Sequence, residues 1–187
     1  MDNATRSDIT RKKAIEAALA ILARDGLGGL TFDALSKESG VSRGGLIHQF
    51  GNKEGVIAAL LSHQRNAFAR IAEEHTKHAG ANKNEITLSA LLATHKASAN
   101  QPLSVGRVIL AALVEFPHLS DDVREPHQKM LKMVREEASD EDLSILRYYA
   151  ASGLALSMLL GLTSVPKATA NRLFDRLMDE DRWHIEE

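Results

Sequence analysis

One stretch of the sequence decides the fold: residues 29–60 read GLTFDALSKESGVSRGGLIHQFGNKEGVIAAL. Two short helices fit on either side of the break at Gly40–Val41–Ser42. Helices that cross at such a turn need small or apolar residues there, and the stretch supplies Ala34, Gly40, Val41 and Leu46. Gly40 also accepts a positive φ without a Cβ clash. The stretch therefore predicts a helix-turn-helix, and Ser42 is expected to cap its second helix.

The rest of the chain shows helical periodicity and no alternating β pattern. A first amphipathic helix is predicted over 9–24, ended by the glycine-rich segment that follows it. Thr31 and Asn52 are expected to cap later helices, and the helix after Asn52 is predicted over 53–78, about 40 Å long. Further helices are predicted over 84–100, 103–116, 121–138, 141–162 and 167–180. Pro126 fits only the first turn of a helix, which favours a later start for the third of these.

These elements predict an all-α fold with two parts. A helix-turn-helix domain is expected over 1–52 and a helical regulatory and dimerisation domain over 53–187, with helix 53–78 linking the two. The formal net charge is −2, so any nucleic-acid-binding surface must be local. Residues 1–56 carry eight Lys/Arg and seven Asp/Glu, a net of +1 that leaves −3 for the remainder.

Several absent sequence features limit the expected cellular location, enzymatic activity and metal binding of the chain. The N-terminus has no apolar core of a signal peptide, so a cytoplasmic protein is expected. The uncharged run Tyr148–Pro166 is interrupted by serine, threonine and glycine, which favours a buried helix over a membrane span. Phosphate-binding loops and nucleophile elbows are missing, so the chain is not expected to be an enzyme. With no cysteine and no two histidines spaced four apart, neither a metal site nor a cofactor is expected.

The helix-turn-helix resembles that of the tetracycline-repressor (TetR) family of bacterial transcription regulators. The resemblance covers about residues 8–62 and rests on Thr31-Phe32, Gly40-Val41-Ser42, Leu46, His48, Phe50 and Lys53-Glu54. It implies a recognition helix in the major groove of DNA and a second domain that dimerises and binds a small molecule. Two positions depart from the family's pattern: the family often has an aromatic residue where Ile47 stands, and threonine or a larger residue where Gly45 stands. Both departures remove DNA contacts and weaken the expectation of direct base readout.

Seven residues are predicted to bind DNA: Thr31, Ser42, Arg43, Gly44, Gly45, His48 and Lys53. Arg43 is assigned to base readout, because arginine can bond bidentately to guanine O6 and N7. Lys53, at a helix N-terminus, is assigned to a phosphate, and Thr31 and Ser42 are given this role in addition to capping. The resemblance implies a phosphate contact for His48. The two glycines leave the helix edge bare, so the backbone can approach DNA closely; the alternative is that they only destabilise a short helix.

Two sets of residues are assigned to the second domain. A cavity for a small, largely apolar ligand is expected between helices, lined by Leu88, Leu92, His95, Leu113, Phe116, Met130, Met133 and Tyr149. The alternative for each of these is an ordinary packed core. The helix over 141–162 is apolar nearly all round, so a second copy of the chain is expected to cover one face. This interface is predicted to include Leu146, Gly153, Leu154, Ser157, Met158, Gly161, Leu173 and Leu177.

These patterns predict a sequence-specific DNA-binding transcriptional regulator. It is expected to act as a homodimer that represses at a double-stranded DNA operator and is released by its ligand. The alternative is a helical protein-interaction module with a degenerate helix-turn-helix, which the departures at Gly45 and Ile47 keep open.

Overall fold

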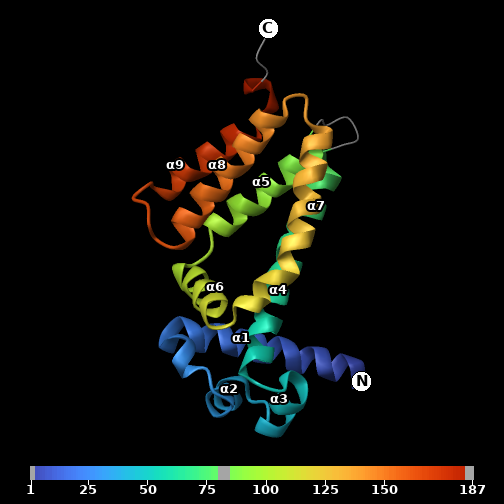
Figure 1. The fold of residues 1–187 in the computed structure, drawn as a ribbon. Helices are drawn as coiled ribbons and strands as arrows, with labels where there is room; N and C mark the ends of the chain where they lie inside the picture. The colour runs from blue at the N-terminus through green and yellow to red at the C-terminus, as the bar shows by residue number, and fades with distance from the viewer. Residues whose placement is uncertain (1–2, 80–84, 184–187) are drawn as a thin grey trace. The chain divides into compact units, whose positions relative to one another are not determined.

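The computed structural model describes residues 3–79 and 85–183, and every regular element in these two ranges is helical (Figure 1). The prediction of an all-α fold is confirmed, and most helices begin and end close to the expected positions. None of the described helices is both long enough and apolar enough to cross a membrane.

Contacts between residues divide the chain into two compact units. The first unit comprises Met1–Arg65 with Arg107–Leu119, and the second comprises Asn66–Gly106 with Ser120–Glu187. Helices α4 (Lys53–Ala79) and α6 (Leu103–Glu115) therefore contribute residues to both units. The boundary predicted after residue 52, between a helix-turn-helix domain and a helical regulatory and dimerisation domain, stays a prediction.

The first unit contains the helix-turn-helix. Helix α1 (Asn3–Gly29) is kinked at Gly26, where the predicted first helix ends. Helices α2 (Phe32–Ser39) and α3 (Arg43–Phe50) are capped as predicted: the N–H of residue 34 donates to Thr31 Oγ1 over 3.1 Å, and the N–H of residue 45 donates to Ser42 Oγ over 3.2 Å. The Asn52 side chain likewise caps α4, accepting from the N–H of residue 55 over 2.8 Å. Gly40 ends α2 with a φ of 70°, as the turn requires.

The core of the first unit draws on five helices. Ile21, Leu35, Leu46 and Ile57 come from α1, α2, α3 and α4 in turn, and each is at most 1% exposed. Ala112 of α6 is also 1% exposed and belongs to the same core, and the segment that follows it packs there through Phe116 and Leu119. The end of α6 and the 3-10 turn η1 (Pro117–Ser120) are therefore a structural part of the helix-turn-helix unit.

The second unit packs around α5 (Ile86–Ala99). This helix contacts α7 (Asp121–Glu137), α8 (Glu141–Leu159) and α9 (Lys167–Met178), and the short turn η2 (Glu180–Arg182) follows. Leu88 and Leu92 of α5, Val134 of α7 and Phe174 of α9 are all 0% exposed. Burying a large apolar side chain contributes about 1.5–3 kcal/mol, so these residues supply much of the stability of this unit.

The start of α7 differs from the expectation. The helix begins at Asp121, so Pro126 lies inside it rather than in its first turn. Pro126 is exposed, so water can reach the carbonyl group that the missing proline N–H leaves unpaired. The helix can therefore begin five residues before the proline.

The end of α8 also differs, since it ends at Leu159 rather than at 162. Gly161 adopts a φ of 69°, a left-handed conformation that closes the helix. The Leu162 N–H donates to the Ser157 carbonyl oxygen over 2.8 Å, and the Gly161 N–H donates to the Met158 carbonyl oxygen over 3.1 Å. The two bonds satisfy carbonyl groups that the helix end would otherwise leave unpaired.

Candidate nucleic-acid interface

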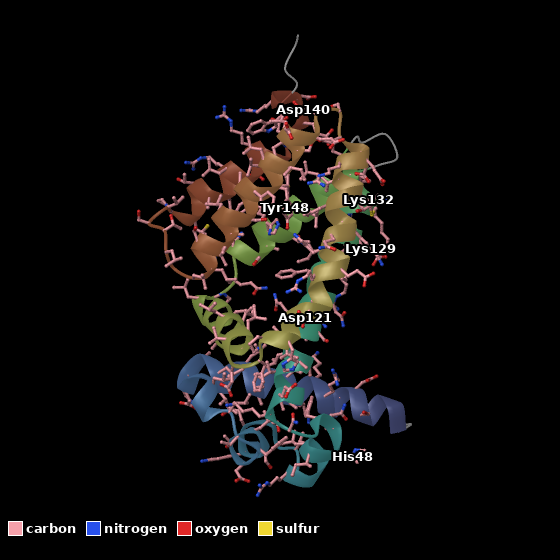
Figure 2. All side chains as sticks on the ribbon, in the orientation of Figure 1. His48, Asp121, Lys129, Lys132, Asp140 and Tyr148 are labelled. Atoms are coloured by element: carbon pink, nitrogen blue, oxygen red, sulfur yellow. The ribbon has the colours of Figure 1, made fainter. Side chains whose placement is uncertain are left out.

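Helix α3 presents one exposed face. Its Leu46 is fully buried and its last residue, Phe50, is nearly so. The exposed residues are Arg43, Gly44, Ile47 and His48. Because residues four apart share one side of a helix, these four lie together, and Figure 2 shows His48 on this helix. Three of the seven residues predicted to bind DNA thus share one solvent-facing surface.

The two permanent cations predicted to contact DNA each lie near a carboxylate. Arg43 Nη1 is 3.4 Å from Asp33 Oδ1, and both side chains are more than 60% exposed, at 62% and 75%. Lys53 Nζ is 3.4 Å from Glu115 Oε1, and these side chains are 34% and 45% exposed. Ion pairs at a surface contribute about 0–1 kcal/mol. Both cations can therefore exchange their carboxylate for a phosphate.

Thr31, Ile47 and Lys53 line one hollow of the first unit, about 230 Å³ in volume. The rest of its lining is mostly apolar and includes Leu30 and Val56. The structure thus brings the cap of α2, the exposed face of α3 and the start of α4 to one place. An isoleucine stands where the family often has an aromatic ring, and its smaller side chain fills less of such a hollow. The roles of these residues toward DNA stay predictions.

The two glycines of α3 have different surroundings. A Cβ added to Gly44 would meet no atom within 4 Å, whereas one added to Gly45 would lie 3.2 Å from the hydroxyl oxygen of Ser42 that caps the helix. A substitution at Gly44 therefore leaves the cap undisturbed. It can distinguish the two explanations for these glycines, which are a close approach of the backbone to DNA and the destabilisation of a short helix.

Replacing Gly44 with alanine is expected to stabilise the fold by about 0.5–1 kcal/mol, because alanine loses less conformational entropy in a helix. The same methyl group stands on the exposed face of α3 and is expected to weaken DNA binding several-fold. Urea unfolding and fluorescence anisotropy on a labelled duplex measure the two effects. A variant that gains stability and keeps its DNA affinity would favour the alternative, in which the glycines only weaken a short helix.

The residues predicted to line a ligand cavity do not form one cavity within either unit. Leu113 and Phe116 belong to the first unit, where Phe116 packs against the core. In the second unit, Leu88 and Leu92 are part of the packed core, which is the alternative considered for them. The remaining apolar members are largely exposed: Met130 36%, Met133 48% and Tyr149 55%. None of the eight lines the hollow of the first unit near Thr31 or the hollow of the second unit near Arg147.

His95, the polar member of that set, lies in a cluster that sequence analysis missed. Its Nε2 is 3.0 Å from Ser152 Oγ, and its ring lies 5.3 Å from the ring of Tyr148, centroid to centroid. The Tyr148 hydroxyl is 3.4 Å from His127 Nδ1. Burial lowers the pKa of His95 to about 4, and the nearby His127 acts in the same direction. The His95 ring is therefore neutral at neutral pH and can hydrogen-bond an uncharged polar group.

The predicted dimer residues divide into two groups by exposure, and their role in an interface stays a prediction. Leu154, Met158 and Leu177 are partly buried and pack against the core of their own unit. Gly161 lies beyond the end of α8. Ser157 is half-buried.

The remaining predicted residues, Leu146, Gly153 and Leu173, are exposed. On α8 the exposed apolar or small residues stand three and four positions apart, and we call them the α8 stripe: Leu146, Tyr149, Ala150, Gly153 and Leu156. Leu146 and Leu156 are 62% and 56% exposed. Because α8 is apolar on nearly all sides, periodicity alone did not separate its exposed side from its packed side.

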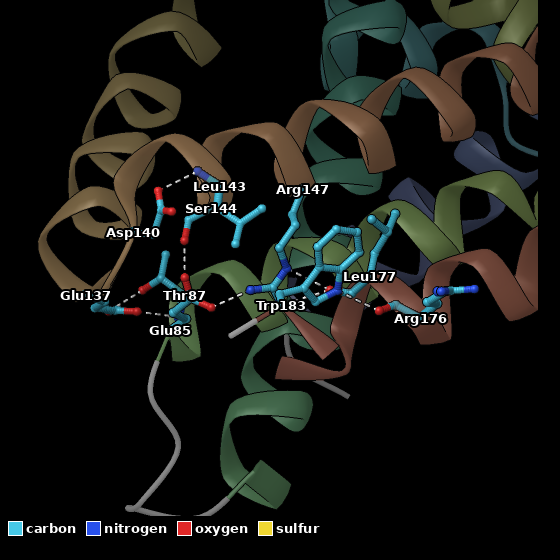
Figure 3. Close-up of polar contacts among 10 residues, drawn as sticks. All are labelled: Glu85, Thr87, Glu137, Asp140, Leu143, Ser144, Arg147, Arg176, Leu177 and Trp183. Atoms are coloured by element: carbon cyan, nitrogen blue, oxygen red, sulfur yellow. Dashed lines mark hydrogen bonds and ion pairs between the residues drawn. The ribbon is translucent and has the colours of Figure 1, made fainter. Parts of the chain in front are cut away.

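A buried ion pair, also missed from the sequence, ties four segments of the second unit together (Figure 3). Arg147 of α8 is 3% exposed; its Nη1 donates to Glu85 Oε2 over 2.5 Å, and its Nε and Nη2 donate to the Leu177 carbonyl oxygen. Glu85, just before α5, also accepts from the Ser144 hydroxyl. The Trp183 ring covers the guanidinium at 5.9 Å. The cluster fastens the start of α5 and the end of α9 to α8.

Comparison with known proteins agrees with this architecture. Residues 14–60 match the family model described as bacterial regulatory proteins, tetR family, and residues 84–182 match the tetracyclin repressor-like C-terminal domain. A search of curated proteins found no match.

Several solved structures share the fold. The fatty acid degradation regulator FadR from Bacillus halodurans superposes with a TM-score of 0.67 at 17% identity, over 90% of this chain and 94% of that one. A TetR-family transcriptional regulator from Mesorhizobium loti gives 0.64 at 20% identity, over 94% and 96% of the two chains. The multidrug binding protein EbrR complexed with ethidium gives 0.60 at 18% identity, over 90% and 98%.

At these identities, likeness to solved structures establishes the fold alone. The family assignment rests on the two family models, which together cover the helix-turn-helix and most of the second unit. The chain belongs to the TetR family of bacterial regulatory proteins.

Proposed function

We propose that the chain is a homodimeric repressor that binds a specific DNA site through α3 and leaves it when a small, largely apolar ligand binds. The observation that carries the DNA-binding part is the exposed face of α3, where Arg43, Gly44 and His48 stand together. The hydroxyl cap of Ser42 and the charge of Lys53 flank this face. A recognition helix reads bases with its N-terminal residues, while flanking groups fix its register on phosphates.

The homodimer is supported by the α8 stripe. Five apolar or small residues of one side of α8 are exposed, and Leu173 of α9 is 41% exposed. Closed two-fold dimers, in which the same patch meets itself, are the commonest soluble oligomers. Two copies would place two recognition helices on one duplex, so the DNA site is expected to be palindromic.

The ligand response is supported by the neutral cluster around His95 and by the relatives. EbrR is described as a multidrug binding protein complexed with ethidium, and FadR as a regulator of fatty acid degradation. Ligand pockets are mostly apolar with a few polar anchors, and His95, Ser152 and Tyr148 offer such anchors without a net charge at neutral pH.

Release would follow from geometry. Two recognition helices must stand about 34–36 Å apart, or a multiple of this, to meet successive major grooves. A ligand that binds more tightly to a dimer with another spacing lowers DNA affinity. The size of the effect is limited by the ratio of the ligand's affinities for the two dimer states. Coupling between two sites of a protein typically changes affinity about 5- to 150-fold, and DNA must weaken ligand binding by the same factor.

Substitutions of Arg43 and Lys53 are expected to change DNA binding in different ways. Replacing Arg43 with alanine should reduce affinity for the preferred site by about 1–3 kcal/mol and relax the choice of base, because its guanidinium is assigned to a base edge. Replacing Lys53 with alanine should weaken all duplexes alike and lower the dependence of affinity on salt by about one ion per half-site, because its ammonium is assigned to a phosphate.

The test is to titrate each variant against a preferred duplex and a scrambled duplex at several salt concentrations. If Arg43→Ala changes neither affinity nor preference, the base-reading role is wrong. If the unmodified chain binds both duplexes equally, the alternative of a degenerate helix-turn-helix is favoured.

A further inference from the structure

Lys53 occupies a position that does not suit a cation. It is the first residue of α4, where the partial positive charge of the helix dipole disfavours a second positive charge. The adjacent Glu54 is placed favourably in the same turn. Lys53 therefore does not stabilise its own helix through the dipole, and an anion outside that helix can offset the unfavourable charge. In the free chain this anion is Glu115, with Nζ and Oε1 3.4 Å apart.

Glu115 is held firmly where it meets Lys53. It is the last residue of α6, between the buried Ala112 and the packed Phe116. Just beyond, His118 Nε2 lies 2.6 Å from Glu54 Oε1, a second link between this segment and the first turn of α4. The backbone that carries the carboxylate is therefore held by its packed neighbours, whereas the lysine ammonium sits on a long flexible stem and can turn away.

The contact is also weak enough to exchange. A charge-assisted N–H···O bond between ions is usually about 2.7–2.9 Å long, and 3.4 Å is well beyond this range. The pair is nevertheless more buried than Arg43 with Asp33, whose side chains are 62% and 75% exposed. Lys53 thus has a defined internal partner that a stronger external anion can displace.

We propose that Glu115 competes with the DNA phosphate for Lys53. The inference rests on the proposed function, in which Lys53 contacts a phosphate. When a duplex binds, Nζ leaves Glu115 for a phosphate oxygen, so breaking the ion pair lowers the net free energy gained on binding. Each half-site then binds less tightly than it would without Glu115. Helix α6 begins in the second unit and ends at Glu115. A movement of α6 would therefore change DNA affinity through this carboxylate.

The experiment compares four variants on one probe: a fluorescein-labelled duplex recovered by the unmodified chain from random DNA. Glu115→Gln removes the competing charge and keeps the size and polarity of the side chain. It is expected to raise affinity about two- to five-fold per half-site, the range of a surface ion pair. In the Lys53→Ala background the same Glu115→Gln change is expected to have no effect, because the ammonium for which Glu115 competes is absent. Glu16→Gln is the matched control, since Glu16 is an exposed carboxylate of α1 in the same unit.

Each result decides the matter. A gain with Glu115→Gln that disappears in the Lys53→Ala background, with no gain for Glu16→Gln, supports competition. A gain of equal size with and without Lys53 shows general repulsion of DNA and overturns the proposal, as does no gain in a variant whose thermal unfolding is unchanged. If the unmodified chain retains no duplex from the random pool, the proposed function fails and this inference fails with it. Binding without the gain overturns the inference alone.

Discussion

Replacing Arg147 with methionine is expected to lower the free energy of unfolding of the second unit by about 3–5 kcal/mol. The methionine keeps most of the apolar stem but leaves the Glu85 carboxylate buried without its cation, and the loss of one partner of a buried ion pair costs about this much. The substitution also removes both donors to the Leu177 carbonyl oxygen. The loss should therefore loosen the start of α5 and the end of α9 together.

The measurement is urea unfolding at a fixed protein concentration, followed by the fluorescence of Trp183, the only tryptophan of the chain. This ring covers the Arg147 guanidinium and donates from Nε1 to the Arg176 carbonyl oxygen over 2.9 Å, so its emission reports on the cluster itself. Arg172→Met, at an exposed arginine of α9, is the control and should change stability by less than about 0.5 kcal/mol. Equal stability of the two variants would show that the ion pair is dispensable.

Replacing Gly153 with glutamate is expected to produce a monomer and to reduce affinity for the full DNA site about a hundred- to ten-thousand-fold. Gly153 lies in the middle of the α8 stripe, and an added Cβ would meet no atom of its own chain within 4 Å. The fold should therefore tolerate the change, while a carboxylate enters the surface that the second copy is proposed to cover. The loss of DNA affinity follows because each half-site alone lacks the avidity of a linked pair.

Light scattering and anisotropy on the same samples measure the two effects. Gln128→Glu places the same charge on the exposed side of α7 in the same unit and is the matched control, expected to leave both properties unchanged. Leu156→Glu provides a second change within the α8 stripe. An unmodified chain that is already monomeric at micromolar concentration would refute the dimer, whatever the variants do.

The first unit was largely predictable because its signals are local. A cap needs only the right side chain two or three residues before an N–H, so Thr31, Ser42 and Asn52 could each be assigned from neighbouring residues. Gly40 at the turn and the buried Leu46 follow from the same short stretch.

The second unit was less predictable because its contacts join residues far apart in the sequence. Glu85 and Arg147 are 62 residues apart, and their pairing depends on α5 crossing α8, which periodicity does not reveal. The cluster of His95, Tyr148 and His127 likewise needs three helices to meet. On α8, apolar residues on both faces left open which residues pack against the core, and periodicity did not reveal that Leu154 and Met158 do so.

The contacts of Lys53 were only half predictable. Its position after a cap at the start of a long helix is a local signal, but Glu115 reaches it only because Ala112, Phe116 and Leu119 join the core of the first unit. The sequence of residues 103–116 has the pattern of any helix of the second domain. Local periodicity does not show which core a helix packs against, so the contact with the first unit could not be predicted.

The most direct test of the account is to sequence the duplexes that the unmodified chain retains from random double-stranded DNA at physiological salt. The account predicts one enriched motif with two-fold symmetry, whose half-sites are centred about one helical turn, or a multiple of it, apart. Retained DNA that shares no motif, or no retained DNA at all, would contradict the claim that α3 reads a specific site.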